Sequence, residues 1–265
     1  MVIDFHTHIF PDKIAARSIK HLENASGITA ATDGTLQGLL TSMDKNGVEI
    51  SVIMPVVTKP SQFESVNNFA VEVNQKYKGK LISFGGIHPD SGDYKKELDK
   101  IKELGLPGIK LHPDYQGVMI DDKRYMDIIE YADSLDLIIL VHAGIDIGLP
   151  NPVHCPPDKA RKVIDKLKPG KLILAHMGGW KQWDEVYEMI AGENVYLDTS
   201  FSLDYLDEEM FLKIIEKHGC EKILFATDSP WSDAKKTAEA IKCLPIARNA
   251  IEDILSGNAK KILKL

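Results

Sequence analysis

Short apolar segments recur along the chain at intervals of about thirty residues, and many are rich in β-branched side chains. Between them lie more polar stretches in which apolar residues return at helical spacing, as at Tyr94, Leu98 and Ile101. This pattern predicts strands that alternate with helices, which is typical of a parallel sheet. Eight strands are expected, over residues 2–5, 48–57, 81–87, 108–111, 137–141, 172–175, 195–197 and 223–226.

The predicted strands are apolar almost throughout, so we expect both of their faces to be buried. Eight such parallel strands close naturally into a barrel, and 265 residues is an ordinary length for one. An open doubly wound sheet is the alternative. However, His6-Thr7-His8 follows the first strand, where a nucleotide-binding sheet would usually carry a glycine-rich loop. We therefore expect an α/β fold, a single (β/α)8 TIM barrel over residues 1–265.

Helix ends and one long loop can also be placed. Gly257 is expected to separate the last two helices. Residues 143–157, rich in proline and glycine, form the longest irregular segment after a strand and are expected to act as a lid. Four aspartates precede or open apolar-periodic runs and are expected to cap helices: Asp158, Asp184, Asp207 and Asp233.

Composition narrows the functional class. The chain has 32 Lys and Arg against 39 Asp and Glu, a formal charge of −7, and no basic run stands out, so a nucleic-acid partner is not expected. No export signal or long uncharged apolar stretch is present, which predicts a cytoplasmic protein without a membrane partner. The three cysteines fit neither a metal-binding pair nor a disulfide framework. A small-molecule substrate is expected, and a homo-oligomer stays open.

The histidines are not scattered evenly. Of nine, six lie at or just past the C-terminal end of a predicted strand: His6, His8, His88, His112, His142 and His176. In a barrel all strand C-termini face one opening, so these side chains are expected to converge there. His21 and His218 fall on helical stretches instead and are expected on the surface.

A metal site is the simplest explanation for this convergence. His6 and His8 are two residues apart, which points both imidazoles to the same face of a strand, where they can share one ion. A lone pair of this kind is weak evidence, but His142, His176 and Asp228 follow other strands. Together the five predict a divalent metal centre.

Several motifs resemble the amidohydrolase superfamily, in the branch that contains aminocarboxymuconate-semialdehyde decarboxylase. They are Asp-Phe-His-Thr-His at the start, Gly-Ile-Lys-Leu-His-Pro at the fourth strand, Leu-Ala-His-Met-Gly-Gly at the sixth, Phe-Ala-Thr-Asp-Ser-Pro at the eighth, and Gly-Asn-Ala near the end. The resemblance implies a barrel of the metallo-dependent hydrolase type with one metal ion. It also implies that His6, His8, His142 and Asp228 bind the ion, and that His176 acts as catalytic base or further ligand.

Lys110 is ambiguous within this resemblance. In binuclear members a fourth-strand lysine is carbamylated and bridges two metals, whereas decarboxylase-like members lack that bridge. Lys110 could instead remain an ammonium that binds a substrate carboxylate. The other candidates for substrate binding are His112, His154, Trp180 and Trp231, each of which could equally be a packing or hydrogen-bonding residue.

The constellation predicts a metal-dependent hydrolase that acts on a small amide, lactone or ester. A bound Zn²⁺ would lower the pKa of its water, Asp228 would carry the proton, and His176 would stabilise the oxyanion or act as base. Three alternatives stay open. They are a decarboxylase of an unsaturated or aromatic acid, a phosphodiesterase or nuclease resembling the TatD family, and a binding barrel without activity. Against the TatD-like reading, Lys110 or His112 stands where that family has a metal-binding glutamate.

Overall fold

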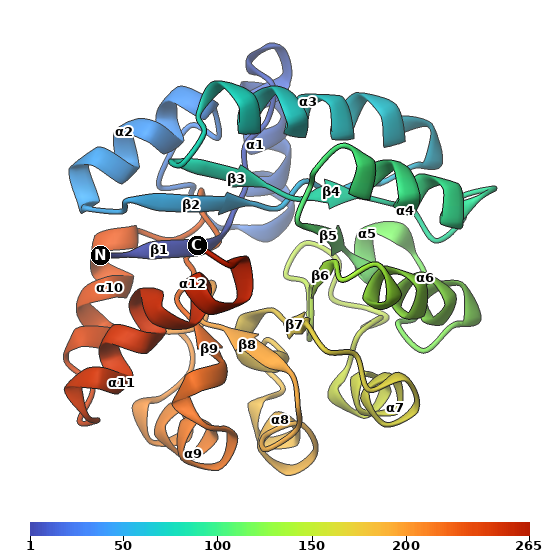
Figure 1. The fold of residues 1–265 in the computed structure, drawn as a ribbon. Coiled ribbons are helices and arrows are strands. Elements are labelled where there is room, and N and C mark those ends of the chain that lie inside the picture. Colours follow the sequence, from blue (N-terminus) through green and yellow to red (C-terminus); the bar gives the residue numbers. More distant parts are fainter.

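The computed structural model describes all 265 residues and shows a ring of parallel strands with helices outside it (Figure 1). The predicted TIM barrel is confirmed. The strands are β1 (Ile3–Thr7), β2 (Ile50–Ile53), β3 (Leu81–Ser83), β4 (Gly85–Gly86), β5 (Gly108–Leu111), β6 (Ile138–Val141), β7 (Leu172–Leu174), β8 (Tyr196–Asp198) and β9 (Ile223–Leu224).

Two ladders make up the barrel, β1-β2-β3 and β4 to β9, and all pairs are parallel. The predicted third strand is interrupted between β3 and β4, and the Phe84 amide continues the pairing by donating to the Ile53 carbonyl at 2.9 Å. On the other side, the Phe5 amide donates to Phe225 O at 2.9 Å and the His8 amide to Ser229 O at 2.6 Å. The first and last strands therefore meet and close the ring.

The helices cover the outside of the strands. They are α1 (Asp12–Ser26), α2 (Leu36–Asn46), α3 (Phe63–Lys76), α4 (Tyr94–Glu103), α5 (Pro113–Gln116), α6 (Lys123–Ser134), α7 (Pro157–Leu167), α8 (Trp183–Met189), α9 (Glu208–His218), α10 (Ala234–Lys242), α11 (Arg248–Glu252) and α12 (Asn258–Leu263). Short 3-10 turns are η1 (Pro60–Gln62), η2 (His176–Gly178) and η3 (Cys220–Lys222). None of the helices has both the length and the apolar character needed to span a bilayer.

Two of the four predicted helix caps are confirmed. Asp207 accepts from the Met210 amide at the start of α9, and Asp233 accepts from the Lys236 amide at the start of α10. Asp158 and Asp184 lie inside the first turns of α7 and α8 and make no cap hydrogen bond, so that prediction is wrong for both. Their charges still lie at the positive end of the helix dipole.

The predicted helix break at Gly257 is wrong. Gly257 has helical angles, φ −60° and ψ −46°, and ends the π-helical turn η4 (Asp253–Gly257) that joins α11 to α12. Asn258 begins α12, and Nδ2 of its side chain donates to the carbonyls of Cys220 and Ile223. A π turn absorbs one extra residue without ending the helix.

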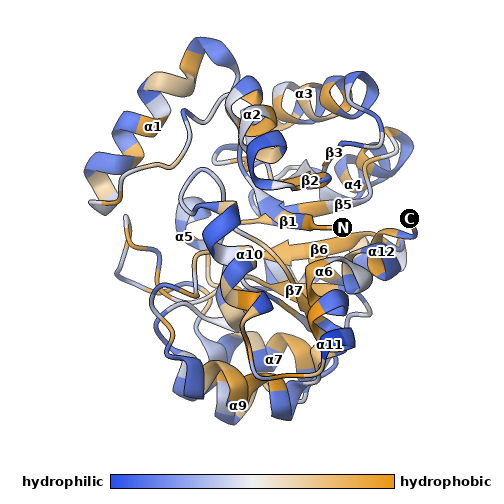
Figure 2. Ribbon diagram, turned by 90° about the vertical axis from the view of Figure 1, so that its left-hand side faces the viewer, coloured by the Kyte–Doolittle hydropathy of each residue, from blue (hydrophilic) through white to orange (hydrophobic).

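Strand residues alternate between two apolar layers. In β6, Ile138 and Leu140 belong to an interior cluster of 14 buried residues, whereas Ile139 and Val141 pack outward in a cluster of 51 that includes the helices. Hydrophobic colour accordingly follows the strands in Figure 2. Ala259 and Ile262 of α12 join the interior cluster, so this helix covers one end of the barrel. The other end is left for polar side chains.

The surface prediction for His218 is wrong, whereas His21 is exposed. His218, in the last turn of α9, is only 5% exposed. Its Nε2–H donates to Val195 O at 3.0 Å, and its Nδ1 accepts from the Gly192 amide at 3.1 Å. This imidazole fastens the end of α9 to the loop before β8. Burial lowers its pKa to about 4.

Candidate metal centre

The end of β1 places two imidazoles beside each other. The pairing of β1 with β2 shifts register between Asp4 and Thr7. Phe5, like Ile3, lies in the interior apolar cluster, and the shift falls around the next residue, His6. The Nε2 atoms of His6 and His8 are 3.1 Å apart. The structure therefore brings these two imidazoles together.

Asp228 completes a group with these two histidines. Its Oδ1 lies 3.0 Å from His8 Nε2 and 3.5 Å from His6 Nε2. Asp228 follows β9 and has a left-handed backbone, φ 60°, which is uncommon for a residue other than glycine and is frequent at functional sites. Burial by itself would raise the pKa of Asp228, but the surrounding imidazoles, His6 foremost, lower it to about 2.

The opposite nitrogen of His6 is held by Asp198, a residue that the sequence analysis missed. Nδ1–H of His6 donates to Asp198 Oδ2 at 2.9 Å, so the lone pair of His6 is on Nε2, facing His8 and Asp228. The other oxygen of Asp198 accepts from the amides of His176 and Ser200. Asp198 directly follows the predicted seventh strand, and that position was the available signal.

Lys110 reaches the same group from β5. Ile109 and Leu111 pack outward against the helices, so Lys110 points into the barrel. Its Nζ lies 3.0 Å from His6 Nε2, and its side chain is almost completely buried. Burial lowers the pKa of Lys110 to about 8, although the carboxylates of Asp228 and Asp198 oppose this shift. An ammonium and a metal ion cannot share one lone pair, so binding of an ion would displace Lys110 from His6.

His176 is brought to the site by an unusual backbone. Ala175 lies in the interior cluster, so strict alternation would turn His176 outward, but the left-handed φ of 58° breaks the alternation. Nδ1 of His176 donates to Ser200 O at 2.9 Å. Its Nε2 is 3.0 Å from His142 Nδ1. His176 therefore lies between the group at His6 and a second group around His142.

His142, the fourth ligand implied by the resemblance, is not part of the first group. It lies with His112 and Asp146 in a second group of potential metal ligands. The rings of His112 and His142 stack at 4.3 Å with an angle of 12°. Burial lowers the pKa of both imidazoles well below the usual value. The sequence analysis had not singled out Asp146, whose pKa burial raises to about 6.

The remaining candidates make hydrogen bonds outside the first group or to its backbone. His154 is in the predicted lid, and its amide and Nδ1 both contact Asp114 Oδ1, at 3.1 and 3.0 Å. Trp180 donates through Nε1 to Phe201 O at 3.1 Å, and the Trp231 amide donates to Asp228 O at 2.9 Å. His88 accepts the Asp90 amide within its own loop.

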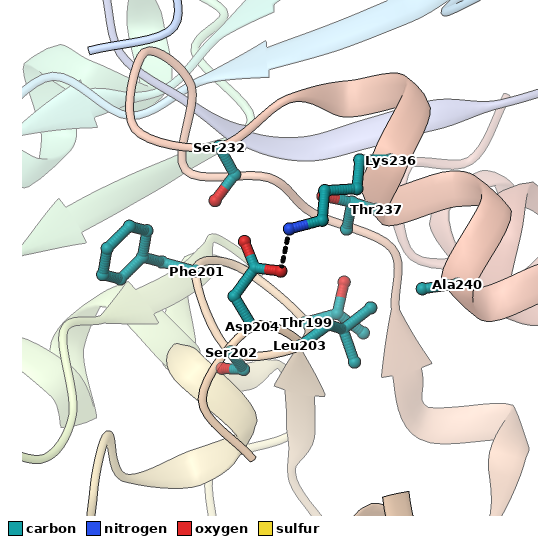
Figure 3. A pocket seen from close by; sticks show the side chains of 9 residues that line it. All are labelled: Thr199, Phe201, Ser202, Leu203, Asp204, Ser232, Lys236, Thr237 and Ala240. Carbon is teal, nitrogen blue, oxygen red and sulfur yellow. Dashed lines mark hydrogen bonds and ion pairs between the residues drawn. The ribbon is translucent and has the colours of Figure 1, made fainter. Parts of the chain in front are cut away.

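A small separate cavity lies between the loop after β8 and α10 (Figure 3). Its volume is about 40 Å³, and an ion pair between Lys236 and Asp204 crosses it. It contains none of the predicted site residues. We assign it no role in binding.

The donor atoms of the first group fit a divalent cation. Two imidazole nitrogens and one carboxylate oxygen are a ligand set that Zn²⁺ and similar ions accept. Nε2 of His6 lies within 3.5 Å of the His8 imidazole, the Asp228 carboxylate and the Lys110 amine. The second nitrogen of His6 donates to a carboxylate, which is the usual way in which proteins orient a metal-binding histidine.

The family is shown by a direct match. A family model described as amidohydrolase covers residues 3–265, so this chain belongs to the amidohydrolase family. The resemblance predicted from the motifs is thereby confirmed. No curated protein gave a significant sequence match to the chain.

Solved structures with the same fold cover essentially the whole chain. An uncharacterised TIM-barrel protein from Bordetella bronchiseptica is 20% identical, with a TM-score of 0.81 and coverage of 99% of this chain and 98% of that one. The 5-carboxyvanillate decarboxylase from Sphingomonas paucimobilis is 16% identical, with a TM-score of 0.72 and coverage of 100% and 99%. A dihydroxybenzoic acid decarboxylase from Polaromonas, solved with manganese and the inhibitor 2-nitroresorcinol, is 18% identical, with a TM-score of 0.72 and coverage of 100% and 97%.

Proposed function

We propose that this chain is a metal-dependent decarboxylase that releases CO₂ from a small aromatic or unsaturated acid. The observation that carries the proposal is the convergence of His6 Nε2, His8 Nε2 and Asp228 Oδ1 beside the buried amine of Lys110. The named proteins with the same fold include decarboxylases of hydroxylated benzoic acids, one of them with bound manganese. They favour this reading over the hydrolase that the sequence analysis put first.

In this proposal His6, His8 and Asp228 hold one divalent ion, Mn²⁺ or Zn²⁺, which supplies Lewis-acid polarisation of a bound carboxylate or hydroxyl oxygen. Lys110, displaced from His6, binds the substrate carboxylate as a buried cation. Asp198 keeps the His6 ring in place, because it accepts Nδ1–H. The site thus neutralises the substrate anion in a poorly hydrated place, where such charges interact most strongly.

Decarboxylation requires one proton, which must reach the carbon that loses the carboxyl group. The bond between the ring or alkene carbon and the carboxyl group breaks, CO₂ leaves, and the electron pair stays on the carbon until a proton arrives. Asp228 and His176 are the candidates for the proton carrier, because both face the group from strand ends. General acids of this kind contribute about 10²–10⁴-fold.

The test is a paired assay on protein loaded with Mn²⁺ or Zn²⁺. Hydroxybenzoic and unsaturated carboxylic acids labelled with ¹³C at the carboxyl group are incubated with it, and labelled CO₂ is measured; lactones, amides and esters are assayed in parallel. We expect CO₂ release that disappears in His8→Ala and persists in the matched control His21→Ala, which alters an exposed histidine. Hydrolysis of a lactone or amide without any CO₂ release would overturn the proposal.

A further inference from the structure

Asp228 lies in a turn whose backbone is strained. Its φ of 60° is in the left-handed region, which a residue other than glycine keeps only where the surrounding structure holds it. Its own backbone is fixed at two points, because its amide donates to His6 O at 2.8 Å and its carbonyl accepts from the Trp231 amide at 2.9 Å. The residues on either side of it, Thr227 and Ser229, are joined by a further chain of hydrogen bonds that runs through side chains.

This chain of hydrogen bonds begins at Asp4 in β1, a residue that the proposed reaction does not use. The Thr227 amide donates to Asp4 Oδ1 at 3.0 Å, and the Thr227 hydroxyl donates to Asp4 Oδ2 at 2.6 Å. The same hydroxyl accepts from the Ser229 amide at 3.0 Å. Both sequence neighbours of Asp228 are therefore tied to one carboxylate, Thr227 directly and Ser229 through the hydroxyl.

The direction of each of these hydrogen bonds is fixed. A backbone amide can only donate, and the single hydrogen of the Thr227 hydroxyl goes to Asp4 because the Ser229 amide already occupies the acceptor side of that oxygen. None of these atoms belongs to the group of potential ligands formed by His6, His8 and Asp228. A bound ion would therefore leave the assignment of donors and acceptors unchanged.

The position of Asp4 is costly for a purely structural contact. The residue is only 2% exposed, and a buried carboxylate loses much of its hydration. The hydrogen bonds from Thr227 and a long one of 3.4 Å from the His6 amide compensate for this loss. The first and last strands are already joined by backbone bonds such as that from the Phe5 amide to Phe225 O. The carboxylate is thus not needed merely to close the barrel.

We propose that Asp4 is a positioning residue for the metal centre, and that it acts through Thr227 to hold the turn that points Asp228 toward His6 and His8. This inference rests on the proposed function, because it takes Asp228 as a ligand. Oδ1 of Asp228 lies 3.0 Å from His8 Nε2 and 3.5 Å from His6 Nε2. A turn released from Asp4 would relax its left-handed backbone and carry this oxygen away from the two nitrogens. Residues that hold a ligand in this way typically change metal affinity about 10–100-fold when they are replaced.

The experiment measures Mn²⁺ affinity of the purified full-length chain. After removal of metals with a chelator, the protein is titrated with Mn²⁺, and the free ion is measured by its electron paramagnetic resonance signal. We expect Thr227→Val, which keeps the shape but lacks the hydroxyl, to raise Kd about 10–100-fold, and Asp4→Asn to raise it at least as much. Thr227→Ser restores the hydroxyl and should bind as the wild type does. Normal affinity in Thr227→Val with weak binding in Thr227→Ser would show that Thr227 only fills space, and would overturn the inference.

Thr199→Val is the matched control. Thr199 is also a fully buried threonine, and its hydroxyl both donates to Ala226 O and accepts from the Ala226 amide, each at 2.9 Å. Urea unfolding should show a loss of stability similar to that of Thr227→Val, whereas Kd for Mn²⁺ should not change. An equal loss of affinity in the two valine variants would mean that affinity follows overall stability, and the positioning role would fall.

Amide hydrogen exchange, followed by mass spectrometry on the metal-free protein, gives a readout that does not depend on the ion. Exchange across residues 227–231 should be faster in Thr227→Val and Asp4→Asn than in the wild type and in Thr199→Val. A wild type that binds no Mn²⁺ would remove the proposed function, and faster exchange in the first two variants would then still support the role of Asp4 in holding the turn. Mn²⁺ binding with one Kd in the wild type, Thr227→Val and Asp4→Asn would overturn this inference and leave the proposed function standing.

Discussion

At the scale of single residues, Asp228 combines two roles that a substitution can separate. Its Oδ1 lies beside His6 and His8, so it is a proposed ligand, and its carboxylate is also a candidate proton carrier. Asparagine keeps the size and an oxygen ligand but cannot carry the proton. We predict that Asp228→Asn retains part of the metal yet loses about 10²-fold or more in kcat, the scale of a lost general acid or base.

Metal content and turnover must be measured on the same preparation of Asp228→Asn. A loss caused only by weaker binding would be rescued by excess Mn²⁺ or Zn²⁺, whereas loss of the proton carrier would not. Near wild-type turnover in the metal-loaded variant would contradict the prediction. The proton would then pass through His176, whose ring lies 5.6 Å from that of His6.

His218 is buried, and its titration makes the stability of the fold depend on pH. Its pKa in the folded chain is about 4, below the value of about 6.5 expected after unfolding. The unfolded chain therefore takes up a proton first as the pH falls, and stability is lost between pH 6.5 and pH 4. At pH 5 this amounts to about 2 kcal/mol relative to pH 7.5, from about 1.4 kcal/mol per pH unit.

The change His218→Gln isolates this contribution, because glutamine can accept from Gly192 and donate to Val195 as the imidazole does, without titrating. Urea unfolding at pH 7.5 and pH 5.0 measures it. The variant should lose about 2 kcal/mol less between the two values than the wild type does. An identical loss in both proteins would show that other groups account for the acid sensitivity.

At the scale of elements, periodicity predicted the strands well but not their local irregularities. All eight predicted segments overlap a strand of the barrel, because burial on both faces leaves a clear apolar signal. The register shift in β1 and the left-handed backbone at His176 carry no such signal, since apolar periodicity reports burial and not backbone register or φ. These two irregularities turn His6 and His176 toward the open end of the barrel.

The same reasoning explains which site residues were missed. The histidines were found because six of nine fall at strand ends. Asp114 and Asp146 were missed because aspartate is frequent in loops for unrelated reasons, such as turns and caps, whereas Asp198 was missed although it directly follows a predicted strand. Their roles depend on which atoms face one another across the barrel mouth, and spacing along the chain does not encode that.

The turn at Gly144 positions the segment that carries Asp146. Gly144 has φ 84°, and a Cβ there would lie 2.0 Å from the backbone nitrogen of Trp180. We predict that Gly144→Ala destabilises the fold by about 2–4 kcal/mol, because left-handed strain of about 1–2 kcal/mol adds to a clash with backbone that cannot move freely.

Gly117→Ala is the control for backbone strain alone. Gly117 has φ 65°, but no atom lies within 4 Å of the position of its Cβ. This variant should lose only about 1–2 kcal/mol. Denaturant unfolding of both variants provides the comparison, and equal losses would show that the approach of Gly144 to Trp180 has no structural importance.

At the scale of the whole molecule, the group of His6, His8 and Asp228 lies where the first and last strands of the barrel meet. His6 lies in the first strand, His8 directly follows it, and Asp228 follows the last strand. Only a few hydrogen bonds join these strands, among them the Asp228 amide to His6 O at 2.8 Å. An ion held by the group would therefore tie together the two ends of the chain, with the apolar interior and α12 supporting the barrel below.

This arrangement predicts that metal stabilises the barrel without being required for folding. At a free Mn²⁺ concentration of 100 times Kd the gain is about 2.7 kcal/mol, which corresponds to about 5–10 °C in Tm for a chain of this size. We expect Mn²⁺ to raise Tm in the wild type and in the exposed control His21→Ala, and to leave it unchanged in His6→Ala/His8→Ala. The double variant should still unfold cooperatively, because it keeps the apolar clusters, although loss of His6 removes the partner of Asp198 Oδ2 and costs about 1–3 kcal/mol. An equal rise of Tm in the double variant would place the ion elsewhere and remove His6 and His8 as its ligands.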